Sequence, residues 1–121
     1  MKTKYNYIHF KKAEFLCNCG CGGQVQSPLI RKLDLAREIA GAPFVITSGF
    51  RCEDYNQQVG GVTDSAHLKG LAADIYADDS LKRFLIISGL LGAGFLRIGI
   101  YPNFIHADID DTKSQERIWL E

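Results

Sequence analysis

Residues 95–109 read FLRIGIYPNFIHADI, and this stretch decides the fold class. Two apolar runs, Phe95–Tyr101 and Phe104–Ile109, are separated by Pro102-Asn103, which favours a hairpin turn between two strands. A further β-rich run at Arg117–Leu120 predicts an edge strand. Consecutive strands at the end of the chain indicate antiparallel pairing. We therefore predict an α+β fold with a small, mostly antiparallel sheet and flanking helices.

Two helices are predicted on the N-terminal side of this hairpin. In the first, Ser27 is expected as the N-cap, Pro28 takes the first helical position and Gly41 ends the helix. Its apolar residues share one face, as in an amphipathic helix: Leu29, Leu33, Ala36 and Ala40. The second helix is expected to run to about Leu91, with a cap from one of three polar residues: Asp78, Asp79 or Ser80. One of two glycines ends it, Gly92 or Gly94.

Two more strands are predicted at Pro43–Thr47 and Leu71–Tyr76. The segment between them includes RCEDYNQQVGG, residues 51–61, which predicts a loop or a short helix closed by its two glycines. No repeat, low-complexity tract or linker divides the sequence, so we expect one domain over residues 1–121.

Composition bounds the class of protein. The 121 residues include 14 Lys+Arg and 14 Asp+Glu, so the formal net charge is zero. A neutral chain gives no electrostatic argument for binding nucleic acid, and no apolar run approaches the ~20 residues of a membrane helix. Residues 1–15 are basic but lack the apolar stretch and cleavage site of a signal peptide, so we expect synthesis in the cytoplasm. A monomer is expected.

The four cysteines leave two interpretations open. Cys17, Cys19 and Cys21 alternate in CNCGCG, and Cys52 lies far along the chain. This spacing departs from the C-x2–4-C pairs of common zinc sites. It favours Cys17 and Cys52 as buried small apolar residues or one disulfide, with the other two incidental to a Gly-rich turn. The alternative is a four-cysteine metal site that stabilises a small structural protein.

Candidate catalytic chemistry lies instead at two of the three histidines. His67 opens HLKGLAAD, which ends at Asp74, and His106 lies in the strand candidate FIHADID. Strand alternation puts Phe104, His106 and Asp108 on one side. Two imidazoles and one carboxylate are a usual zinc-binding set when the fourth position is left for water. From spacing alone, an ordinary loop histidine and a hydrogen-bonded strand histidine remain the alternative.

The residues around these histidines are similar to one known family. SGFRC, NQQVGG and SAHLKGLAADI together resemble the zinc D-Ala-D-Ala carboxypeptidases and related peptidoglycan endopeptidases, peptidase family M15, and most nearly its short phage and prophage branch. The pattern S-x-H-x-x-G-x-A-x-D is matched by Ser65, His67, Gly70, Ala72 and Asp74. An SG-aromatic-R turn and a closing H-x-D are matched by Arg51, His106 and Asp108. The resemblance runs from about Phe15 to Asp110.

The resemblance implies three ligands for one catalytic zinc ion: His67, Asp74 and His106. It also implies the hedgehog/DD-peptidase type of α+β fold, and a peptidoglycan stem or cross-bridge peptide as substrate. Arg51 is then expected to stabilise the oxyanion or bind a substrate carboxylate. Ser65 binds substrate or holds its loop. Asp108 orients a zinc-ligand imidazole or takes part in catalysis.

One departure from the family pattern concerns the general base. Relatives carry an acidic residue three positions before the last histidine, or a histidine five before it, where this chain has Asn103 and Tyr101. Asn103 cannot accept a proton, and Tyr101 is better suited to donate a hydrogen bond or a proton. Asp108, or a carboxylate from elsewhere such as Asp78, then remains as the base.

The expected function is a zinc peptidase that acts on the cell wall after release, for example in phage lysis. The alternative is a catalytically weak or inactive wall-binding phage module that retains the zinc site.

Overall fold

The computed structural model describes residues 7–121. Five strands form one sheet in the order β1-β2-β4-β3-β5: β1 (Ile46–Ser48), β2 (Ala72–Tyr76), β3 (Arg97–Ile100), β4 (Phe104–Asp108) and β5 (Arg117–Leu120). The pairs are antiparallel except β3 with β5, which is parallel. The predicted α+β fold with a mostly antiparallel sheet is confirmed. Residues 1–6, which carry part of the signal-peptide expectation, lie outside the described residues.

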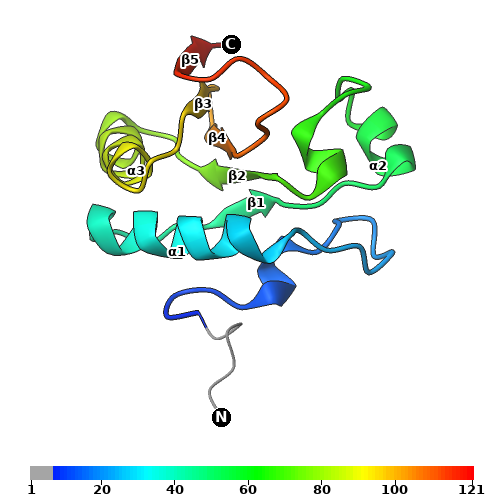
Figure 1. Ribbon diagram of the computed structural model, residues 1–121, viewed down its shortest axis with the longest axis horizontal. Coiled ribbons are helices and arrows are strands. Elements are labelled where there is room, and N and C mark those ends of the chain that lie inside the picture. The colour runs from blue at the N-terminus through cyan, green and yellow to red at the C-terminus, as the bar shows by residue number, and fades with distance from the viewer. Residues whose placement is uncertain (1–6) are drawn as a thin grey trace.

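Helices α1 (Ser27–Ala40) and α3 (Ser80–Gly92) pack on each other and on one face of the sheet. Figure 1 shows α1 running across the molecule beside β1 and β2, with α3 at one end. Three short elements complete the fold: η1 (Lys12–Phe15), α2 (Glu53–Gln58) and η2 (Ala66–Lys69). Within residues 7–121, no helix is long and apolar enough to cross a membrane.

The register of β2 on β4 separates the core from the polar face. Ala73 pairs with Ala107 and Ile75 with Ile105, and all four side chains are buried in the core. Because strand side chains alternate, the intervening pairs face the other side of the sheet. Those intervening pairs are Asp74 with His106 and Ala72 with Asp108. The hydrophobic pattern therefore fixes where the polar residues meet.

The predicted boundaries hold within a few residues, and two of them shift for reasons that the structure shows. The N-cap of α1 is Gln26, not Ser27, which is already helical. Gln26 stays extended because its side-chain amide donates to the Lys69 carbonyl at 2.9 Å. Strand β1 begins at Ile46, after the predicted start at Pro43, and its pairing with β2 is irregular. The expected cap of α3 is confirmed, since Asp79 accepts from the Lys82 N–H.

Candidate metal and active site

Three elements bring together the three predicted metal ligands. Asp74 on β2 faces its partner His106 on β4, and η2 supplies His67. Ser65 caps η2 by accepting from the His67 N–H. The turn closes at Gly70 with φ 72°, where a Cβ would lie 3.2 Å from the Gln26 nitrogen, so both conformation and space favour glycine.

Two imidazole nitrogens point at one carboxylate oxygen. His67 Nε2 lies 3.2 Å and His106 Nδ1 lies 3.0 Å from Asp74 Oδ1. One candidate ligand atom from each of these residues lies within 4.8 Å of the others. His67 and Asp74 are buried, and the His106 side chain is 13% exposed. The arrangement is a compact donor set with one accessible side.

The outer nitrogens of both rings are already engaged. His67 Nδ1 lies 2.7 Å from the Gly49 carbonyl oxygen, and His106 Nε2 lies 2.7 Å from Asp108 Oδ2. A carbonyl and a carboxylate only accept, so these outer nitrogens carry the hydrogens. In neutral rings the inner nitrogens then present lone pairs toward the Asp74 carboxylate. Three acceptors facing one point fit a cation, and such support of ligand histidines is usual in metal sites.

The pKa values of Asp74 and His106 are both shifted by the contacts between them. Burial raises the pKa of Asp74, but His106 and His67 in their protonated forms donate hydrogen bonds that outweigh it and hold that pKa well below its usual range. Burial lowers the pKa of His106, while Asp108 and Asp74 reverse this and leave it raised. Positive charge is therefore favoured beside Asp74.

Arg51 lies beside the cluster, in the turn after β1. Its guanidinium donates to Ser48 Oγ, Asn56 Oδ1 and Asp74 Oδ2, each at 3.2 Å. A guanidinium has five N–H donors, so two remain. With 15% of its side chain exposed, Arg51 is held in place and still accessible.

Asp108 is 1% exposed and fully engaged. Its Oδ1 accepts from Arg97 Nε at 2.8 Å and from the Asp110 N–H at 3.1 Å, and Oδ2 contacts His106. Burial raises the pKa of Asp108, but His106 and Arg97 outweigh it and leave it lowered. Arg97 in turn lies over the Trp119 ring at 4.9 Å. Asp108 thus connects a candidate ligand to a cation.

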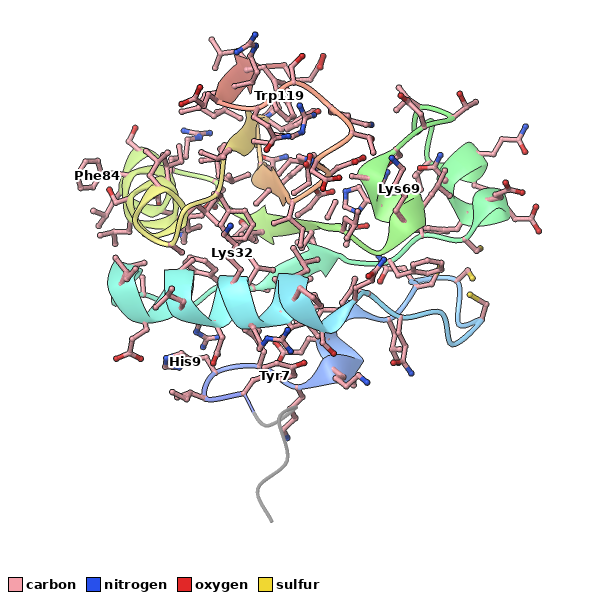
Figure 2. All side chains as sticks on the ribbon, in the orientation of Figure 1. Tyr7, His9, Lys32, Lys69, Phe84 and Trp119 are labelled. Carbon is pink, nitrogen blue, oxygen red and sulfur yellow. The ribbon has the colours of Figure 1, made fainter. Side chains whose placement is uncertain are left out.

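These groups line a cavity of about 450 Å³ that also includes Ser65 and Tyr101. Trp119, from β5 and labelled in Figure 2, pairs with Gly99. A Cβ on Gly99 would lie 2.6 Å from the indole nitrogen, so the tryptophan requires glycine beneath it. The same nitrogen donates to the Tyr101 hydroxyl at 3.4 Å, and Tyr101 stacks on Phe104. The aromatic groups form one wall.

Two sequence expectations fail, one at this site and one at the cysteines. Asp78, considered as a base, is not among the residues that line the cavity, and it is bonded to Tyr76 and Lys82 at the start of α3. The possible disulfide between Cys17 and Cys52 is also wrong, because all four cysteines are free and their sulfur atoms cluster. Cys17 is buried as expected, whereas Cys52 is half-buried.

Among the lining residues that the sequence did not single out, four carry charged or indole side chains: Arg97, Lys113, Trp119 and Glu121. Alternation along Phe95–Tyr101 does place Arg97 on the face of Gly99 and Tyr101, so a signal existed for it. Lys113 comes from the loop after β4, Trp119 from β5 and Glu121 from the position after β5, and the approach of these segments to the site has no local sequence signature.

A His-Asp-His cluster at the base of a cavity, on an antiparallel sheet, is the kind of site that metallopeptidases use. Residues 8–108, most of the chain, match the family model Peptidase M15. The chain therefore belongs to peptidase family M15, as the sequence resemblance implied. No curated protein matches it.

Proposed function

We propose that this protein is a zinc-dependent peptidase that hydrolyses peptide bonds of bacterial peptidoglycan. The observation that carries the proposal is the convergence of His67, Asp74 and His106 at the base of an open cavity, with Arg51 beside them. The proposed place of action is the cell wall, which the enzyme reaches after release from the cell in which it is made.

The donor set suits zinc. His67 and His106 offer imidazole nitrogens and Asp74 offers a carboxylate oxygen, with the cavity on the remaining side. Held by these three residues, zinc would supply Lewis acidity toward a scissile carbonyl and would lower the pKa of water to about 7. Gly49 and Asp108 support this role by fixing the tautomers of the two rings.

The chain's own groups supply the remaining chemistry. The two uncommitted N–H groups of Arg51 are available to an oxyanion or a substrate carboxylate. Ser65 Oγ accepts from the His67 N–H, which leaves its own hydrogen for substrate. The Tyr101 hydroxyl accepts from Trp119, so it too can donate toward the cavity.

Proton acceptance falls to a residue other than Asp108. Both Asp108 oxygens are engaged and its pKa is lowered, so we assign it the role of positioning His106. Among residues 7–121, Glu121 is the carboxylate lining the cavity that has no ion-pair partner. We therefore propose Glu121 as the proton acceptor, and Glu121→Gln tests it by loss of turnover with retention of zinc.

The substrate class is proposed from the family resemblance and the cavity's charge. Stem peptides of peptidoglycan carry D-Ala residues and free carboxylates, and the cations Arg51 and Lys113 line the cavity. Walls from Val59, Val62 and Trp119 accommodate small apolar side chains.

The experiment combines metal analysis with fragment identification. Purified protein is incubated with defined peptidoglycan, with and without a chelator, and released fragments are identified by mass spectrometry. We expect new amino groups that disappear with the chelator and return with zinc. His67→Ala should remove activity, and His9→Ala, which changes the histidine paired with Glu38 away from the site, should not. Cleavage by metal-free protein would overturn the mechanism.

A second candidate is a wall-binding module without turnover. Asn103 and Tyr101 stand where relatives carry a base, and this favours it. Zinc binding and retention on peptidoglycan, with no amino groups released on long incubation, would establish this function instead.

A further inference from the structure

We propose that Cys17, Cys19, Cys21 and Cys52 form a structural zinc site, separate from the histidine cluster. One sulfur atom from each of these residues lies within 4.8 Å of the others. They come from the loop between η1 and α1, where sulfur atoms are visible in Figure 2, and from the residue before α2.

The separations among three of the sulfur atoms are close to those of a tetrahedral thiolate site. Cys17 Sγ lies 3.4 Å from Cys19 Sγ and 3.9 Å from Cys52 Sγ, and Cys19 and Cys52 are 3.6 Å apart. A tetrahedron with zinc–sulfur distances of ~2.3 Å places its sulfur atoms about 3.8 Å apart. The protein thus brings thiols that are distant in sequence to the spacing that one zinc ion requires.

The backbone explains how such close cysteines converge. Gly20 and Gly22 adopt φ values of 88° and 85°, with open space where a side chain would stand. The left-handed conformation, rather than crowding, therefore calls for glycine on either side of Cys21. These turns bend the chain tightly enough for alternate cysteines to approach one point.

Hydrogen bonds to sulfur support the same assignment. The Cys52 N–H donates to Cys17 Sγ and the Tyr55 N–H donates to Cys52 Sγ, both at 3.4 Å. Backbone donors of this kind stabilise the thiolate form that binds metal. Four protein sulfurs complete a tetrahedron and leave no position for substrate, which is the pattern of a structural site.

The surrounding loop is held mainly by hydrogen bonds, such as that from the Asn18 amide to the Thr47 carbonyl at 3.0 Å, and buries few side chains. Residues 18–22 are all exposed, and the loop buries only Cys17 and Val25 in the protein. Cys52 directly follows Arg51, and the Gly49 carbonyl of the same turn supports His67. A metal on the cysteines would therefore connect the N-terminal loop to the turn that positions two active-site groups.

The test counts metals in the full chain. Protein purified with reductant and zinc is examined by native mass spectrometry and elemental analysis. We expect about two zinc ions per wild-type chain and about one in His67→Ala. Replacing the zinc in His67→Ala with cobalt should give the intense thiolate-to-metal absorption of tetrahedral sulfur ligation. The zinc that remains in His67→Ala is measured without turnover and without the histidine cluster, so failure of the peptidase proposal would leave this result intact.

Variants assign the metal to the cysteines. Cys19→Ser should lose one zinc ion and lower Tm by about 5 °C or more, whereas Gln24→Ser, at an exposed position in the same loop, should keep both. A wild-type chain with one zinc ion that His67→Ala abolishes would overturn the proposal. So would a disulfide among these cysteines in freshly purified protein, detected by mass.

Discussion

The two clusters of candidate metal ligands are built in different ways. The histidine cluster rests on sheet register: Asp74 faces His106 because the apolar residues on either side of each are buried on the other face. The cysteine cluster rests on a loop whose conformation depends on Gly20 and Gly22. The first exposes its donors to a cavity and the second surrounds its centre with protein sulfur. An open donor set suits chemistry, and a closed one suits stability.

The largest expected effect is on activity, and it should distinguish a catalytic histidine cluster from a structural cysteine cluster. His67→Ala should reduce peptidoglycan hydrolysis on the order of a thousandfold or more, because a metal ion's stabilisation of the transition state amounts to several kcal/mol. The cysteine-bound metal and the folded state should remain, measured by zinc content and circular dichroism, with His9→Ala as control. Loss of both metals in His67→Ala would contradict the proposal that the two clusters bind metal independently.

Arg51 stands between the clusters, with Cys52 next in sequence and Asp74 at its guanidinium. Arg51→Lys should lower kcat about 100-fold, because a lysine cannot keep the three anchoring bonds and still present a fork to substrate. Both zinc ions should be retained. The control is Arg31→Lys on the exposed side of α1, and unchanged kcat in Arg51→Lys would exclude Arg51 from catalysis.

A substitution of Asp108 tests whether this carboxylate positions the candidate ligand His106. Asp108→Asn should weaken zinc binding at the histidine cluster about 10–100-fold, because His106 loses the carboxylate that fixes its tautomer. Competition with a chelating dye measures the affinity, and Asp111→Asn, at an exposed neighbouring position, is the control. Zinc affinity equal to wild type would contradict the positioning role, and the cysteine site should not change.

The smallest expected effect concerns Asp110, in the loop after β4 that also supplies the cavity-lining residue Lys113. Burial raises the pKa of Asp110, but hydrogen bonds from Thr112 and Lys69 outweigh burial and lower it to about 2. Asp110→Asn should reduce the free energy of unfolding by about 1–3 kcal/mol at pH 7. A lowered carboxyl pKa stabilises the fold above the unfolded value of about 3.9, and this contribution is lost as pH falls toward 2.

Urea unfolding at several pH values measures this contribution. The difference between wild type and Asp110→Asn should narrow as pH falls from about 4 to 2. A difference that stays constant over this range would show that charge on Asp110 does not stabilise the loop.

Sequence reasoning predicted the elements whose signals are local. The hairpin around Pro102-Asn103 and the helix ending at Gly41 follow from turn chemistry and periodicity, and both are present. Alternation in FIHADID correctly placed His106 and Asp108 on one face. The cap at Gln26 was missed because its anchor is the Lys69 carbonyl, a contact distant in sequence. The ion pair of Arg97 with Asp108 likewise depends on strand pairing.

By itself, the sequence determined the fold class, because periodicity and turn chemistry are properties of neighbouring residues. It also determined the family, and the three candidate ligands follow from that resemblance. Tertiary structure alone decided that Asp108 is held by Arg97, that Trp119 lies over Gly99 and that four cysteines meet at one point. Such contacts join segments far apart in the chain, and their geometry depends on sheet register and loop conformation rather than on local residue preference.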